Sequence, residues 1–257
     1  QMKSLGKKTT LAAVFVFSML VIWSFASAVP AHAATSIGRG YSDTEFRTLT
    51  QSFFNLYQGG NPSEAMLDEY AQMAYCDLYK AHYDDDFRWN QIREAIKGNL
   101  KAYGGNTQHK YELVGNLTLE RYNFEKEFFP IEAESQLNNV GQLYLFSSPG
   151  YFNFCGRSGQ LDVLPAYHLM SLFEPLNLTQ VEIPADKAKQ ITPFMKNVGN
   201  GYKRLYARYR LHILDFEELK DSRNLEAVYK GQVEAIDFFL DEALTQPVHS
   251  INFTSGF

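Results

Sequence analysis

The sequence predicts an α+β protein in which a helical segment precedes a β-rich body. Apolar residues recur at helical spacing between about residues 42 and 103, and then alternate with polar residues between 202 and 240. Hydrophobic residues make up 45% of the 257-residue chain and aromatic residues 15%, which is enough to build a buried core. Because the two patterns are segregated along the chain, we expect an N-terminal helical segment and a mostly antiparallel sheet.

We expect about three helices in the first half. Ser42 and Glu45 have the spacing of a capping box, which predicts that the first helix starts there and ends at Gly59. Pro62 opens the second helix, which we expect to contain Cys76.

A third helix is predicted to start at the acidic run 84–86 and to close at Gly104. The three aspartates of the run suit the positive end of the helix dipole. They also raise the alternative of calcium, but the spacing of an EF-hand loop is absent.

The rest of the chain predicts strands. Short β-rich runs separated by turn residues occur at 110–114, 117–124, 127–132, 142–146, 166–173 and 181–184. One inserted helix is predicted at about 185–197, after Pro184. Two longer strands, 202–216 and 225–240, close the domain as a C-terminal hairpin of antiparallel neighbours.

The first strand of that hairpin has a charged face. It carries, at alternate positions, Arg204, Tyr206, Arg208, Arg210 and His212. One interpretation is a solvated face with cross-strand charge pairs to the partner strand. The other is an anion-binding stripe of Arg204, Arg208, Arg210 and His212 for a carboxylate or phosphate ligand.

The N-terminus has the order of a secretory signal peptide. A basic start is followed by the apolar run 11–25 and by the small-residue site Ala31-His32-Ala33, so we predict cleavage after Ala33. The alternative is an uncleaved membrane anchor. We expect a flexible lead at 34–41, a single domain at 42–246 and a C-terminal tail at 247–257.

Cleavage there would remove three lysines and no acids. The mature chain would keep 21 basic and 29 acidic residues, a net charge of −8. An acidic chain argues against general nucleic-acid binding, which depends on neutralising phosphates. The predicted location is the periplasm or the extracellular space, and we expect no membrane span in the mature chain.

Export favours a disulfide between Cys76 and Cys155, the two cysteines of the chain, because cysteines in an oxidising compartment usually pair. The alternative is two free thiols. In that case Cys155 could act as the nucleophile of a hydrolase, with a histidine such as His168 as its base. His82, His109, His212 and His249 are the other histidines of the predicted domain and tail, and spacing selects none of them.

Four segments together resemble the domain of unknown function 4852. They are "CDLYKAHYDDDFRWNQIRE", "LTLERYNFEKEFFPI", the pair Cys155-Gly156 and "PLNLTQVEIPADKA". The similarity covers most of residues 70–190. It implies an uncharacterised domain of secreted bacterial proteins, and it implies no catalytic residue.

No known catalytic, zinc-binding or nucleotide-binding motif is present, so we expect neither a metal nor a cofactor. The sequence therefore favours an exported, non-enzymatic binding or interaction module of the bacterial envelope. Its expected partner is an envelope protein or a small anionic ligand. The cysteine-dependent hydrolase remains the alternative function.

Overall fold

The structure is a computed structural model that describes residues 40–59, 61–104, 109–147, 152–155, 157–159, 161–221 and 223–253. By internal contacts the chain divides into Gln1–Thr35 and Ser36–Phe257, and all described residues belong to the second unit. The predicted signal peptide and its cleavage site after Ala33 lie outside the described residues.

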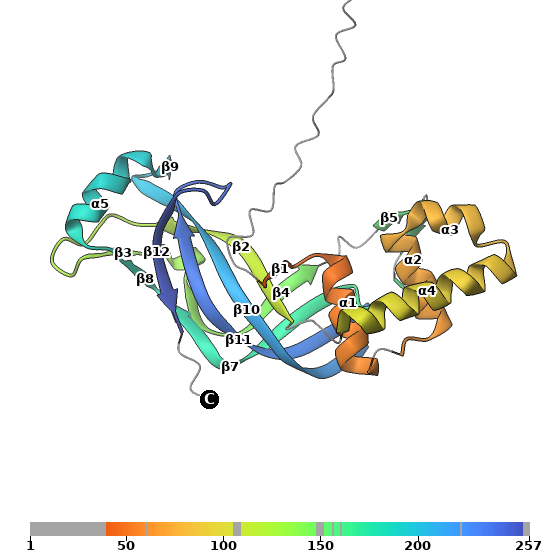
Figure 1. The fold of residues 1–257 in the computed structure, drawn as a ribbon. Helices are drawn as coiled ribbons and strands as arrows, with labels where there is room; N and C mark the ends of the chain where they lie inside the picture. Colours follow the sequence, from red (N-terminus) through yellow and green to blue (C-terminus); the bar gives the residue numbers. More distant parts are fainter. Residues whose placement is uncertain are drawn as a thin grey trace, which may run out of the picture. The chain divides into compact units, whose positions relative to one another are not determined.

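The α+β prediction is confirmed (Figure 1). The α-helices of the described residues are α1 (Phe46–Gln58), α2 (Glu64–Ala74), α3 (Cys76–His82), α4 (Asp86–Gly104) and α5 (Ala185–Ile191). Two short 3-10 helices occur at Ala133–Ser135 (η1) and Thr192–Phe194 (η2). The first four α-helices precede nearly all of the strands, as the segregated sequence patterns predict.

The main sheet of the described residues has eight strands and is mixed, with mainly antiparallel pairs. They are β1 (Ser42–Asp43), β2 (Lys110–Leu119), β4 (Leu137–Ser147), β7 (Tyr167–Leu178), β9 (Lys196–Gly199), β10 (Tyr202–Asp221), β11 (Leu225–Phe239) and β12 (Pro247–Asn252). The order along the sheet is β1-β2-β10-β11-β7-β4, and β9 and β12 add to β10 and β11. The pairs β1–β2 and β7–β11 are parallel.

Two small sheets accompany the main one. β3 (Phe128–Pro130) pairs with β8 (Gln180–Glu182), and β5 (Phe152–Phe154) pairs with β6 (Arg157–Gly159). Both pairs are antiparallel. The β5–β6 hairpin has no alternating pattern long enough to have been predicted from the sequence.

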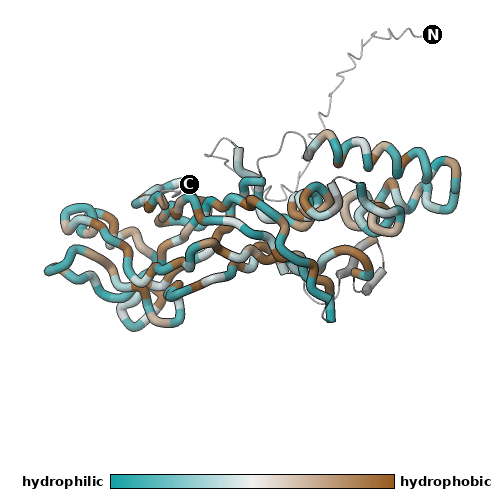
Figure 2. The backbone as a smooth tube through the Cα atoms, turned by 90° about the horizontal axis from the view of Figure 1, so that it is seen from below, coloured by the Kyte–Doolittle hydropathy of each residue, from teal (hydrophilic) through white to brown (hydrophobic). Residues whose placement is uncertain are grey.

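The hairpin of β10 and β11 is confirmed, with Tyr206 opposite Phe239 and Asp221 opposite Leu225. Alternation of hydrophobic and hydrophilic residues is visible along the strands in Figure 2. Three register shifts interrupt the pair, and they act as β-bulges that re-aim side chains.

Several predicted boundaries are wrong. The second helix is two helices, because the backbone leaves the helical conformation at Tyr75, where φ is −140° and ψ is 48°. The capping box also lies three residues later than expected: Glu45 is the N-cap of α1 and pairs with Thr48, while Ser42 lies in β1. The inserted helix ends at Ile191, and Lys196 already belongs to β9.

Both ends of the predicted domain also need correction. Residues 247–252 of the expected tail form β12, which pairs with β11 from Ala235 to Phe239. At the other end Tyr41, expected in a flexible lead, donates its hydroxyl hydrogen bond to Glu234 of β11. These contacts tie Tyr41 and residues 247–252 to the sheet.

The core lies mainly on the face of β10 that carries Leu205, Ala207, Leu211 and Ile213, all fully buried or nearly so. Helix α1 packs there through Leu49 and Phe53. Two tyrosines of the sheet fix this contact, because the Tyr111 hydroxyl donates to the Thr48 carbonyl at 3.1 Å and the Tyr229 hydroxyl to the Leu49 carbonyl at 3.3 Å. The opposite, charged face of β10 is left for polar contacts.

Candidate functional site

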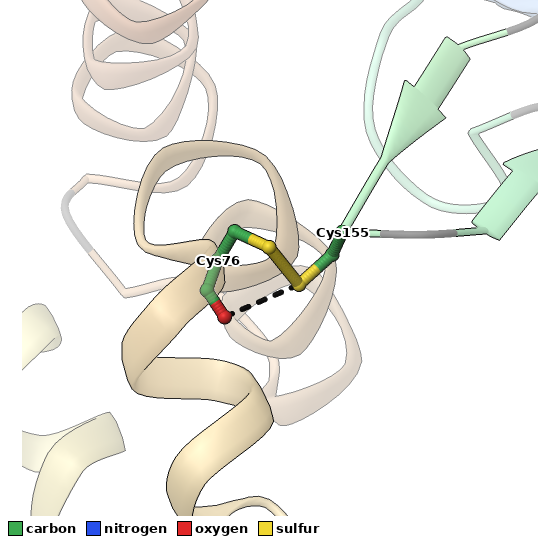
Figure 3. Close-up of a disulfide and its surroundings, with 2 residues drawn as sticks. All are labelled: Cys76 and Cys155. Carbon is green, nitrogen blue, oxygen red and sulfur yellow. Dashed lines mark hydrogen bonds between the residues drawn. A yellow bond between two sulfur atoms is a disulfide. The ribbon is translucent and has the colours of Figure 1, made fainter.

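The predicted disulfide between Cys76 and Cys155 is present, with the two Cα atoms 5.1 Å apart (Figure 3). Cys76 is the first residue of α3. Because Phe154 pairs with Arg157, only residues 155 and 156 connect β5 to β6, and Cys155 adopts a positive φ of 54°. The Sγ atom of Cys155 lies 3.2 Å from the carbonyl oxygen of Cys76. The bond therefore joins α3 to a tight hairpin turn.

A second contact between the helices and a distant segment, here called the Glu69 anchor, was not predicted from the sequence. The buried carboxylate of Glu69, on α2, accepts hydrogen bonds from the backbone N–H groups of Asp162, Val163 and Leu164 at 2.6, 3.0 and 2.7 Å. Burial raises the pKa of Glu69, and these three bonds offset only part of that effect. Sequence spacing gives no signal for this contact, because the donors follow Glu69 by more than 90 residues.

A cleft of about 560 Å³ opens between α2 and α4. Its lining residues are Glu64, Tyr83, Asp84, Asp86, Trp89, Asn90 and Arg93. Three of these side chains are acidic, and the single cation among them is Arg93. The cleft therefore combines aromatic rings with an excess of negative charge.

One carboxylate holds the inner wall of this cleft together. Asp68 of α2 receives two hydrogen bonds of 2.6 Å from the Arg93 guanidinium and one of 2.8 Å from the Trp89 Nε1–H. Arg93 also donates to Glu64 at 2.9 Å. Bidentate arginine–carboxylate pairs are geometrically specific, so α2 and α4 are held in one arrangement. The positive charge of Arg93 is therefore neutralised by its ion pairs with Glu64 and Asp68.

Three aromatic rings lie beside the ion pair of Asp68 and Arg93. The Tyr79 and Tyr83 rings stack at 4.3 Å between centroids, and Trp89 meets them edge-on at 5.2 and 5.5 Å. Trp89 is buried, whereas Tyr83 is 41% exposed. Phe87, in the first turn of α4, is 87% exposed. Aromatic surface therefore continues from the wall of the cleft to the solvent.

The acidic run 84–86 divides between two roles. Asp85 caps α4, as predicted, because its carboxylate accepts from the Arg88 backbone N–H at 3.0 Å. Asp84 and Asp86 instead line the cleft, and no described residue forms a hydrogen bond or ion pair with either side chain. No group of three or more histidine, cysteine, aspartate or glutamate side chains among the described residues is arranged to hold a metal ion.

The charged face of β10 is partly neutralised by acids. Arg208 forms ion pairs with Asp237 of β11 at 3.0 Å and with Glu112 of β2 at 3.8 Å. Arg210 pairs with Asp237 at 3.2 Å, and Nδ1 of His212 lies 3.2 Å from Glu234. The predicted cross-strand pairs are present. The face is less solvated than expected, because Arg208 is only 6% exposed.

Glu234 joins this face through a β-bulge. Arg210 pairs with Ala235 and Leu211 with Val233, so Glu234 is the extra residue between them. Burial raises the pKa of Glu234, but hydrogen bonds from Tyr41 and Lys110 outweigh it and hold the pKa below its ordinary value. Arg204 is the exception in the stripe. Within the part of the chain that the structure describes, it forms no ion pair, and its buried Nε has no hydrogen-bond partner.

His168 is fully buried among aromatic rings. Its ring stacks on Tyr229, with Nδ1 2.8 Å from the Tyr229 hydroxyl, and it has edge contacts with Phe46 and Phe146. Burial lowers the pKa of His168 to about 3, so it is neutral at ordinary pH. The sulfur of Cys155 is bonded to Cys76, so it is not a free thiol that could attack a substrate. A fully buried histidine with so low a pKa is also a poor general base.

A second cavity, of about 480 Å³, lies between β12 and the β7–β8 connection. Its lining residues are Asn177, Leu178, Thr179, Gln180, Glu182, His249 and Ile251. It contains no phenylalanine, tyrosine or tryptophan ring. Burial lowers the pKa of His249 and nearby Lys187 lowers it further, while Glu182 partly opposes both effects.

A family model described as Domain of unknown function (DUF4852) matches residues 63–196, just over half of the chain. The chain belongs to the DUF4852 family. No curated protein and no solved structure matches it. The DUF4852 match begins at the N-cap of α2 and ends at the first residue of β9, so it contains the cleft, Glu69 and both cysteines.

The rest of the chain lies outside the DUF4852 match. That part includes α1 and the strands β10, β11 and β12, which complete the sheet. No helix of the described residues is both long and apolar enough to cross a membrane.

Proposed function

We propose that this protein is an exported, non-enzymatic binding module, and that the cleft between α2 and α4 binds a basic segment of a partner protein of the cell envelope. The observation that carries the proposal is the combination of unpaired acids and aromatic rings in one cleft. Asp84 and Asp86 line it beside Tyr83, and no described residue pairs with either carboxylate, while Arg93 is already bound by Asp68 and Glu64.

A lysine or arginine side chain suits both properties of this cleft. Its aliphatic stem can lie along an aromatic ring while the charged end meets the carboxylates. A cation above an aromatic face gains about 0.5–1 kcal/mol at an exposed site. The exposed Phe87 would then contact an apolar neighbour of that basic residue in the partner chain.

Export is supported by two independent features. The N-terminal residues have the order of a signal peptide, and disulfides persist mainly in oxidising compartments. A binding role rather than a catalytic one is supported by the state of Cys155 and His168, which are disulfide-bonded and buried.

Tryptophan fluorescence tests the cleft directly. The chain has two tryptophans, and Trp23→Phe leaves Trp89 as the single reporter whether or not the N-terminal segment is cleaved. We would titrate this protein, purified from the periplasm, with an oligolysine peptide and with an oligoglutamate peptide. We expect saturable changes with oligolysine alone, and reading the N-terminus of the same sample tests export.

The decisive variant is Asp84→Asn combined with Asp86→Asn. We expect it to weaken oligolysine binding about tenfold, equivalent to about 1.4 kcal/mol. The matched control is Asp77→Asn with Glu94→Gln, which removes two exposed acids of α3 and α4 that do not line the cleft. Equal losses in both variants would show attraction by net charge alone and would contradict a specific cleft.

A further inference from the structure

Three polar side chains form a row across one end of the sheet. Arg204 of β10 pairs with Thr118 of β2 on one side and with Lys196 of β9 on the other. Directly paired residues of antiparallel strands point to the same face, with their Cβ atoms about 5 Å apart. Thr118, Arg204 and Lys196 are therefore neighbours on the charged face of β10.

This row lacks the acids that neutralise the rest of the face. Arg208 and Arg210 share Asp237, and His212 has Glu234. Neither Arg204 nor Lys196 takes part in any ion pair of the described residues. Like charges directly opposite each other on neighbouring strands are destabilising, so this pair costs stability unless an anion lies between them.

The hydrogen bonds of the row are also incomplete. The Nε of Arg204 is buried and has no hydrogen-bond partner among the described residues, although buried donors are almost always satisfied. The Thr118 hydroxyl forms no hydrogen bond with the described residues, although its backbone N–H donates to Ser135 at 3.3 Å. A guanidinium fork, an ammonium group and a hydroxyl are thus available on one face.

More positive charge lies around the β9–β10 turn. The side chain of Arg121 lies against Gly201, with its Nε 3.5 Å from the position that a Cβ would occupy there. No ion pair of the described residues includes Arg121. Summed charge of one sign raises the local concentration of ligands of the opposite sign.

We propose that Arg204, Lys196 and Thr118 bind a phosphate dianion, either free phosphate or a phosphate monoester. Two uncompensated cations match the charge of about −2 that a phosphate monoester carries near neutral pH. The planar arginine fork suits phosphate oxygens, and lysine adds a point charge. This site is separate from the cleft between α2 and α4 and does not depend on the proposed function.

The buried Nε–H of Arg204 offers a direct readout by NMR. We would follow its ¹H–¹⁵N cross-peak, assigned by its loss in Arg204→Lys, during titrations at constant ionic strength above the second pKa of phosphate. The probes are inorganic phosphate, glycerol 3-phosphate and acetate. We expect saturable shifts with phosphate and much weaker binding of acetate, which carries one charge.

Charge variants locate the site. Lys196→Gln changes an exposed side chain and leaves the buried arginine in place, and we expect it to weaken phosphate binding about tenfold. The control Lys203→Gln removes the same charge one residue from Arg204, on the other face of β10, and we expect it to leave binding nearly unchanged.

Three results would overturn the proposal: a shift that does not saturate, equal affinity for acetate and phosphate, or equal losses in the two lysine variants. Binding of inorganic phosphate without glycerol 3-phosphate would assign the site to the free ion. Tighter binding of glycerol 3-phosphate than of inorganic phosphate would assign it to a monoester.

Discussion

Acid is expected to destabilise this protein through one buried histidine. His168 is fully buried, and its Nδ1 lies 2.8 Å from the Tyr229 hydroxyl, which in turn donates to the Leu49 carbonyl. Both hydrogen bonds form when neutral His168 carries its proton on Nδ1 and donates it to the Tyr229 hydroxyl oxygen. Its Nε2 then has no partner among the described residues, and protonating it would place an uncompensated charge among aromatic rings.

The magnitude follows from the two pKa values. The pKa of His168 is about 3 in the folded protein, against about 6.5 in an unfolded chain. Between these two values the unfolded state binds a proton that the folded state does not. The contribution of neutral His168 to stability is therefore fully present above pH 6.5 and decreases as the pH falls toward 3. Each pH unit below 6.5 costs about 1.4 kcal/mol, so a change from about pH 7 to about pH 5 removes about 2 kcal/mol.

The assay compares urea unfolding of the wild-type protein and His168→Asn at these two pH values, with the disulfide intact. Asparagine keeps an N–H donor near the Nδ1 position but does not titrate. The variant is expected to be less stable at neutral pH, because it loses ring packing, yet to lose about 2 kcal/mol less than the wild type on acidification. Other histidines and acids contribute equally to both proteins. An equal acid loss in the two proteins would refute the reasoning.

Three further variants have outcomes that urea unfolding can measure. Cys76→Ala combined with Cys155→Ala should lower the free energy of unfolding by about 4–5 kcal/mol, because it opens a ring of about 80 residues; an unchanged urea midpoint would contradict the disulfide. Gly231→Ala should cost about 1–3 kcal/mol, because its Cβ would lie 2.5 Å from the His212 carbonyl oxygen and from Sδ of Met170. Gly98→Ala, in the exposed interior of α4 with open space around it, should instead stabilise the protein by about 0.5–1 kcal/mol, and a loss of stability would contradict this.

The elements that could be predicted are those whose residue pattern is local in the sequence. The alternation of β10 and the helical spacing of α1 and α4 depend on neighbours within the same element, so they can be read along the chain. The break between α2 and α3 at Tyr75 has no glycine or proline to mark it. Likewise β12 is short and was missed, because its strand character depends on pairing with β11.

The candidate sites were predicted only in part for the same reason. The cysteine pair followed from composition and from the expected compartment. The Glu69 anchor and the neutralisation of Arg208 by Asp237 depend on contacts between distant segments and on strand register. Register also decides that Arg204 faces Lys196 instead of an acid. The stripe was visible in the sequence, but its one unneutralised arginine was not.

The disulfide also bears on the order of events during folding. Both cysteines precede β10 and β11, the two central strands of the sheet. A chain that emerges from its N-terminus can therefore close this bond before its central strands arrive. With two cysteines there is a single intramolecular pairing, so early closure cannot trap a wrong connectivity. Forming the bond requires an oxidant, but a disulfide isomerase would have no wrong intramolecular pairing of these two cysteines to correct.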